Sequence, residues 1–91
     1  MLFTSLPLTI QQIKEGFGCD FASLFSEDYV EVRRSERWFH VGRNGIRPYQ
    51  EEFDWVGPFQ NGLAFAKLGT ETFKIGVDGS RVDGNGQQQG P

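Results

Sequence analysis

The chain has 91 residues and a formal net charge of −3, so it fits one small domain whose acidic balance argues against a general nucleic-acid binder. The core of so short a chain is thin, and nine Phe, two Trp and two Tyr increase the area that it can bury. No apolar stretch approaches the roughly 20 residues of a membrane-spanning helix. Cys19 is the only cysteine, which rules out an intrachain disulfide and favours a reducing compartment. We therefore expect a cytoplasmic domain without membrane contact.

The first predicted element is a short helix over residues 10–15. Thr9 and Gln12 have the spacing of a capping box, and Gly16 is expected to close the helix. Such a helix would cover the open end of the β units that follow, since a terminal unit needs a different outer face. Residues 1–16 are therefore predicted to form an N-terminal cap.

The rest of the chain carries two similar segments at an offset of 34 residues. The clearest matches are Phe39 with Phe73, Val41 with Ile75, Gly42 with Gly76, Asn44 with Asp78, Gly45 with Gly79 and Arg47 with Arg81. We predict two tandem units, at residues 17–50 and 51–84. The remaining residues, 85–91, have no aliphatic or aromatic side chain and are predicted to be a disordered tail.

Each unit alternates apolar and polar residues with a period of two, which predicts strands rather than pairs of helices. Phe39 and Val41 share one face of such a strand, and His40 points to the other, solvent-facing side. The predicted fold class is mainly β, with three short antiparallel strands in each unit. The predicted strands are residues 29–33, 37–43 and 46–50, then 63–67, 72–77 and 80–83, with a short strand or packing loop at 19–21 and 53–56.

Two Asx-Gly pairs are predicted to be hairpin turns. Asn44-Gly45 and Asp78-Gly79 occupy the same place in the two units. This dipeptide favours a type I′ turn, because both central residues need a positive φ.

The second unit resembles the WG-repeat family. Residues 59–64 match its aromatic-x-x-Gly-Leu-Ala segment, residues 73–79 match its following strand and turn, and the resemblance covers about residues 17–83. The Trp-Gly pair of the family is incomplete, since neither Trp38 nor Thr72 is followed by glycine. The resemblance implies a bacterial, β-rich tandem repeat that mediates contacts, and it offers no catalytic residue.

Partner-binding residues are predicted where arginine, aromatic and outward apolar side chains coincide. Arginine beside tryptophan is typical of protein–protein hot spots, and Phe65 is expected to point outward between Ala64 and Ala66. The alternative for the basic stretch is a solvated face whose arginines pair with Glu31 and Glu36. The predicted partner-binding residues are Arg37, Trp38, His40, Trp55 and Phe65.

A competing hypothesis is a small hydrolase that uses His40 with Glu51 and Glu52. Against it, Lys74 replaces His40 in the second unit, and the two glutamates have the character of solvated loop acids. We therefore predict no catalytic residue.

No metal site and no cofactor are predicted. Asp20 and Asp54 occupy equivalent places before an aromatic residue, which favours the capping of a turn over metal binding. Cys19 is predicted to be a small core residue. The predicted function is a non-catalytic module that binds or scaffolds a protein. The alternative is a structural fragment of a longer array, which would self-associate through its open repeat ends.

Overall fold

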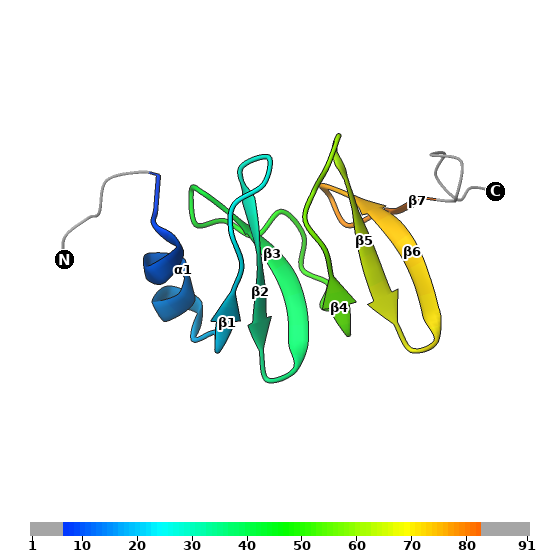
Figure 1. The fold of residues 1–91 in the computed structure, drawn as a ribbon, viewed down its shortest axis with the longest axis horizontal. Helices are drawn as coiled ribbons and strands as arrows, with labels where there is room; N and C mark the ends of the chain where they lie inside the picture. The colour runs from blue at the N-terminus through cyan, green and yellow to red at the C-terminus, as the bar shows by residue number, and fades with distance from the viewer. Residues whose placement is uncertain (1–6, 83–91) are drawn as a thin grey trace.

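The computed structural model describes residues 7–82, which form one helix and two antiparallel sheets (Figure 1). The elements in chain order are α1 (Ile10–Phe17), β1 (Phe21–Ala22), β2 (Tyr29–Arg34), β3 (Arg37–Gly42), β4 (Trp55–Val56), β5 (Leu63–Leu68), β6 (Glu71–Gly76) and β7 (Arg81–Val82). The first sheet has the order β1-β2-β3 and the second β4-β5-β6-β7. The prediction of a mainly β fold with a short N-terminal helix is confirmed, and the predicted tail lies outside the described residues.

The two sheets are built from equivalent strands. The bounds of β1, β2 and β3 recur in β4, β5 and β6 with every residue number shifted by 34. The register is repeated as well, because Val30 opposes Val41 in the first sheet and Ala64 opposes Ile75 in the second. The second sheet differs by its additional edge strand, β7.

The helix begins at the predicted capping box. The Thr9 hydroxyl accepts a hydrogen bond from the Gln12 backbone N–H at 3.1 Å, and the Gln12 side chain accepts one from the Thr9 N–H at 2.8 Å. The helix extends to Phe17 rather than stopping at Gly16, because Gly18 adopts the left-handed conformation (φ 67°) that closes it. No helix within residues 7–82 has the length and apolar character needed to cross a membrane.

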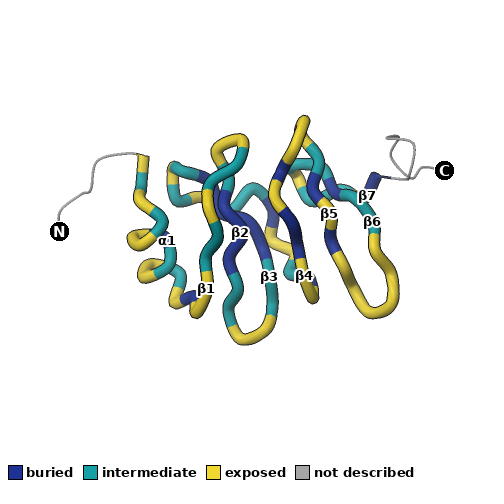
Figure 2. Tube along the Cα trace, in the orientation of Figure 1, coloured by how far each residue is buried: buried dark blue, intermediate teal, exposed yellow. Residues whose placement is uncertain are grey.

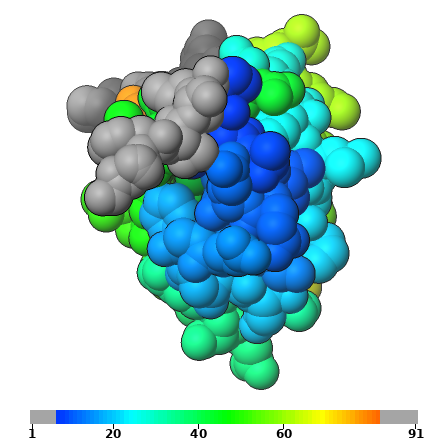
Figure 3. Space-filling view, turned by 90° about the vertical axis from the view of Figure 1, so that its left-hand side faces the viewer, coloured from blue at the N-terminus to red at the C-terminus, as the bar shows by residue number. Residues whose placement is uncertain are grey.

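This helix covers one face of the first sheet. Ile13 is 1% exposed, and the Phe17 ring meets the Phe39 ring edge-on with 6.1 Å between centroids. Figure 3 looks at this end of the molecule and shows α1 spread across it. The N-terminal face of the β structure is therefore closed by apolar packing.

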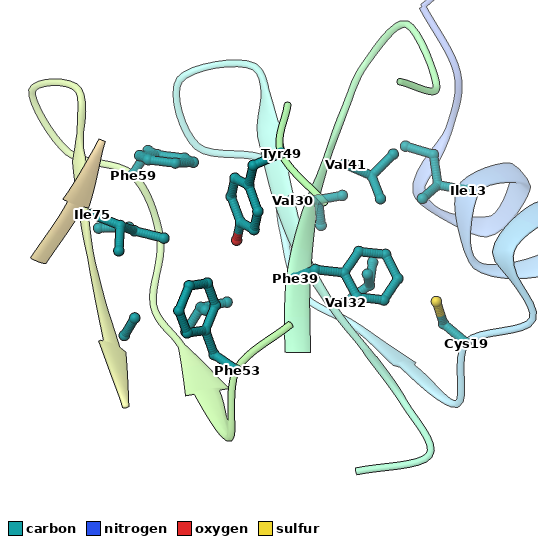
Figure 4. Close-up of a cluster of buried hydrophobic side chains, with 13 residues drawn as sticks. Ile13, Cys19, Val30, Val32, Phe39, Val41, Tyr49, Phe53, Phe59 and Ile75 are labelled. Atoms are coloured by element: carbon teal, nitrogen blue, oxygen red, sulfur yellow. The ribbon is translucent and has the colours of Figure 1, made fainter. Parts of the chain in front are cut away.

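The first sheet is buried on both faces, so the molecule has three layers: α1, the first sheet and the second sheet (Figures 1 and 2). On the helix side the sheet buries Val30, Val32, Phe39 and Val41, which are all 0% exposed. Its other face carries Glu31 and His40, and Figure 4 shows Tyr49, Phe53, Phe59 and Ile75 on that side. The prediction that Glu31 and His40 face solvent is wrong, since they are 6% and 1% exposed beneath the second sheet.

Main-chain hydrogen bonds join the two layers. Trp38 and Phe53 form an isolated antiparallel bridge, in which the Trp38 N–H donates to the Phe53 carbonyl at 2.8 Å and the reverse bond is 2.9 Å. The Phe53 ring then reaches the Phe73 ring of β6 at 5.9 Å between centroids. The second sheet is thus held to the first by backbone as well as by side chains.

The Asx-Gly turns do not have the predicted type. Only the glycines take a positive φ, 80° at Gly45 and 83° at Gly79, and the Gly45 N–H donates to the Gly42 carbonyl at 2.9 Å. This is a three-residue loop with a left-handed glycine after the turn, not a type I′ turn. The strand predicted at residues 46–50 is also absent, since Pro48 has no N–H for a sheet ladder.

Two-residue turns with two positive φ values occur elsewhere, at Glu27-Asp28, Ser35-Glu36 and Asn61-Gly62. Only the last has the favourable dipeptide. A left-handed residue with a Cβ costs about 1–2 kcal/mol, so the double variant Ser35→Asn/Glu36→Gly should raise the free energy of unfolding by about 1 kcal/mol. Urea denaturation of this variant and the parent measures the change. A lower stability of the variant would contradict the assigned turn type.

Candidate binding face

The arginines of the predicted basic stretch are held in ion pairs. Arg37 Nη1 lies 2.7 Å from Asp54 Oδ1, and Arg37 Nη2 donates a hydrogen bond to the Glu52 carbonyl at 2.9 Å. The other pairs are Arg33–Asp20, Arg34–Glu52, Arg43–Asp28, Arg47–Glu52 and Arg81–Glu71. The acids are not the predicted Glu31 and Glu36. Arg37 therefore links the first sheet to the segment that precedes the second.

His40 lies in the interface between the two sheets. Its Nε2 is 2.9 Å from the Gly57 carbonyl and its Nδ1 is 2.6 Å from the Tyr49 hydroxyl, while the Phe59 ring lies at 4.2 Å between centroids. A carbonyl can only accept, so Nε2 carries the proton and Nδ1 accepts from the tyrosine. On β2, Glu31 opposes His40 and accepts a hydrogen bond from the Ser23 hydroxyl at 2.6 Å.

Burial sets the charge state of this pair. It lowers the pKa of His40 from 6.5 to about 4, with the Gly57 hydrogen bond acting in the opposite direction, and it raises the pKa of the Tyr49 hydroxyl above its usual range. His40 is consequently neutral near pH 7. Its two ring nitrogens are engaged within the fold, which makes it a structural residue and not part of an accessible binding surface.

The hydrolase hypothesis needs His40 beside Glu51 and Glu52. In the described part of the chain no hydrogen bond joins them, and the Glu52 carboxylate lies between Arg34 and Arg47 at 3.2 and 3.4 Å. The structure thus gives this hypothesis no assembled group of side chains.

The residues considered for metal binding or thiol chemistry have structural contacts. Asp54 Oδ2 accepts from the Gly69 N–H at 2.7 Å, which confirms turn capping for this aspartate, whereas Asp20 binds the Arg33 side chain. Cys19 is buried as predicted, and burial raises the pKa of its thiol. Residues 7–82 contain no group of three or more His, Cys, Asp or Glu side chains placed to hold a metal ion.

Trp38 is half-buried at the side of the first sheet. Its ring lies 5.6 Å from the Phe21 ring and 6.0 Å from the Arg33 guanidinium carbon. These contacts use the strand positions that oppose each other in β1, β2 and β3. Trp38 is therefore engaged locally and does not share a surface with Phe65.

Trp55 and Phe65 lie together on the face of the second sheet that points away from the first sheet. The strand register places on this outer face Trp55, Leu63, Phe65, Lys67, Thr72, Lys74 and Val82, of which Val82 is buried. Phe65 is 52% and Trp55 42% exposed, and Lys74 Nζ lies 5.3 Å from the Phe65 ring centroid. The Trp55 indole leans over Gly57, where a Cβ would come within 2.9 Å of a ring carbon, and the Gly57 N–H bonds the Phe65 carbonyl at 2.9 Å.

The lysines of the outer face differ from the arginines elsewhere. Within residues 7–82 neither Lys67 nor Lys74 forms an ion pair, whereas all six arginines do. The outer face therefore joins two exposed aromatic rings to two cationic groups that form no ion pair with any residue from 7 to 82. Such a surface is complementary to an acidic partner that brings apolar side chains.

A pocket of about 220 Å³ opens beside Phe65 where β5 begins. We call it the rim pocket, and its lining includes Gln60, Asn61, Leu63, Phe65 and Lys74. It is a concave feature at the edge of the outer face.

Of the predicted partner-binding residues, Trp55 and Phe65 lie together on the outer face. Arg37 and His40 instead make contacts between the two units, and Trp38 packs on the first sheet. Lys67 and Lys74 were not among the predicted residues. A signal was present, because Phe65 and Lys74 replace Glu31 and His40 at the offset of 34 and so mark a change of environment. Comparison of the chain with profiles of known protein families, with curated proteins and with solved structures found no match.

Proposed function

We propose that this chain is a non-catalytic β-repeat module that binds a protein partner through the outer face of its second sheet. The observation that carries the proposal is the adjacency of Trp55 and Phe65, both largely exposed, to two lysines without ion pairs in the described chain. Exposed aromatic side chains of this kind act as anchors in protein interfaces, where they supply most of the binding energy.

The layering of the fold supports this choice of surface. The helix covers one face of the first sheet, and the two sheets cover each other, so three of the four sheet faces are packed (Figure 2). The outer face has no corresponding layer within residues 7–82. Its cationic groups favour a partner with exposed carboxylates, because opposite charges raise the association rate and select the orientation.

We further propose that the two units are a tandem repeat of the WG-repeat type. The identical bounds and register of the strands at an offset of 34 support this assignment. The lone, buried Cys19 is consistent with a reducing compartment, and we propose the cytoplasm as the location.

The double variant Trp55→Ser/Phe65→Ser tests the binding face. We expect tagged wild-type protein to recover one or a few proteins from a host-cell lysate, identified by mass spectrometry, and the variant to lose them. Its melting temperature should change little, since both side chains are exposed.

The matched control is Leu24→Ser/Ile46→Ser, which removes two apolar side chains that are 78% and 63% exposed elsewhere on the surface. This control should retain the captured proteins. Equal capture by both double variants would contradict the assigned face. Capture of only a second copy of the chain would show that the outer face mediates self-association and does not bind another protein.

A further inference from the structure

The rim pocket has a counterpart in the first unit, and that counterpart is filled. Among its lining residues, Gln60, Asn61, Leu63, Phe65 and Lys74 correspond at an offset of 34 to Ser26, Glu27, Tyr29, Glu31 and His40. Three of these residues, Ser26, Tyr29 and His40, contact Phe59, the 0% exposed residue that the second unit inserts into the first. The Phe59 ring lies 5.3 Å from the Tyr29 ring and 4.2 Å from the His40 ring, measured between centroids.

The backbone around Phe59 is held at the same place. The Ser26 hydroxyl donates to the Phe59 carbonyl at 2.7 Å. The Glu27 carboxylate accepts from the N–H groups of the tight turn that follows, at Asn61 and Gly62, at 2.5 and 2.9 Å. Two residues before the ring, the Gly57 carbonyl accepts from His40. The first unit therefore contacts the Phe59 ring, the carbonyls of Gly57 and Phe59, and the turn that follows the ring in the chain.

The second unit offers groups of matching capacity in its rim pocket. Gln60 replaces Ser26, and its side-chain amide can donate a hydrogen bond to a carbonyl. Asn61 replaces Glu27, and its side-chain oxygen can accept a hydrogen bond from the backbone N–H groups of a turn. Lys74 replaces His40 as a donor, with the added charge of an ammonium group. Leu63 and Phe65 provide apolar walls.

The size of the pocket suits one ring. An apolar cavity of roughly 150 Å³ is enough to hold benzene, and the rim pocket measures about 220 Å³. Residues 83–91 supply no candidate, because their sequence contains no aromatic side chain.

We propose that the rim pocket binds an aromatic side chain of the partner protein, carried on an extended segment that runs into a tight turn, in the way that Phe59 docks on the first unit. This inference rests on the proposed function and names the chemistry of the partner. Lys67 and Lys74 favour a segment that also carries carboxylates.

The chain itself provides the probe. A peptide with the sequence of residues 51–62 contains the docking phenylalanine, the turn and three acidic residues. Titrated into the isotope-labelled full chain, it should shift the NMR signals of Asn61, Leu63, Phe65 and Lys74. The same peptide with Phe59→Ala should bind at least about tenfold more weakly, because it lacks the anchor.

A gain-of-binding variant sharpens the test. Leu63→Tyr restores the aromatic wall that Tyr29 provides in the first unit, so it should bind the peptide about threefold more tightly. The control, Ile46→Tyr, adds the same ring at an exposed loop position and should leave the affinity unchanged.

No shift at millimolar peptide, equal binding of the two peptides, or shifts confined to other surfaces would overturn the inference. The proposed function is tested independently, by the capture experiment. If the peptide fails to bind but Trp55→Ser/Phe65→Ser still abolishes partner capture, the outer face binds a partner without an aromatic side chain in the rim pocket.

Discussion

Replacing Phe59 by alanine is expected to lower the free energy of unfolding by about 3–5 kcal/mol, a large share of the stability of a domain this size. The ring is fully buried between the two sheets and packs against Tyr29 and His40. Its loss removes buried apolar area and leaves a cavity at the interface that joins the layers. We therefore expect the second sheet to lose its attachment to the first in this variant.

Urea denaturation followed by circular dichroism measures this effect. Phe65→Ala is the matched control, since it removes the same side chain from a position that is 52% exposed and should cost less than about 1 kcal/mol. A similar loss in both variants would contradict the assignment of Phe59 as the residue that joins the sheets.

Local pattern was sufficient for most of the β structure. The strands predicted at residues 29–33 and 63–67 each end one residue short of the observed β2 and β5, because their alternation reports directly on which side chains are buried. The turn types at Asn44 and Asp78 were wrong because the same Asx-Gly pair also suits a loop in which only the glycine is left-handed.

Polar residues on the first sheet could not be placed from the pattern. A polar side chain between two apolar residues of a strand is usually solvent-facing. Glu31 and His40 are instead covered by a second sheet that begins at Trp55, 24 and 15 residues later in the chain. Alternation identifies the two faces of a strand and does not reveal how many of them are packed.

The candidate site was predictable in part. Phe65 was identified because it departs from the residue at the equivalent position, and the structure places it on the exposed outer face. Arg37 could not be excluded from sequence, since its partner Asp54 lies 17 residues away and only the stacking of the sheets brings the two together.

Acidification from pH 7 to pH 4 is expected to cost about 3 kcal/mol through His40 alone. In the unfolded chain the imidazole takes up a proton near pH 6.5, whereas in the fold burial lowers its pKa to about 4. Between these values the unfolded state binds more protons than the folded state. The contribution of neutral His40 to the free energy of unfolding is therefore fully present above pH 6.5 and is lost as the pH falls toward 4.

Protonation of His40 would also disrupt the hydrogen bonds of its ring. An imidazolium has two donors, so the Nδ1 proton would face the Tyr49 hydroxyl, which now donates to that nitrogen. A charge would also arise against the Phe59 ring, in the interface that joins the two sheets. Glu31 lies opposite His40 on β2, and its carboxylate already accepts a hydrogen bond from Ser23. Protonation should therefore loosen the attachment of the second sheet.

Because His40 is the only histidine, an NMR titration of its ring proton reads the pKa directly. Stability measured across this pH range in wild type and in His40→Gln separates its effect from that of the carboxylates, which titrate in both proteins. The amide can keep a donor and an acceptor but takes up no proton, so the stability advantage of the wild type at pH 7 should shrink by about 3 kcal/mol at pH 4. A His40 pKa near 6.5 in the folded protein, or parallel pH profiles, would show that the imidazole is not buried between the sheets.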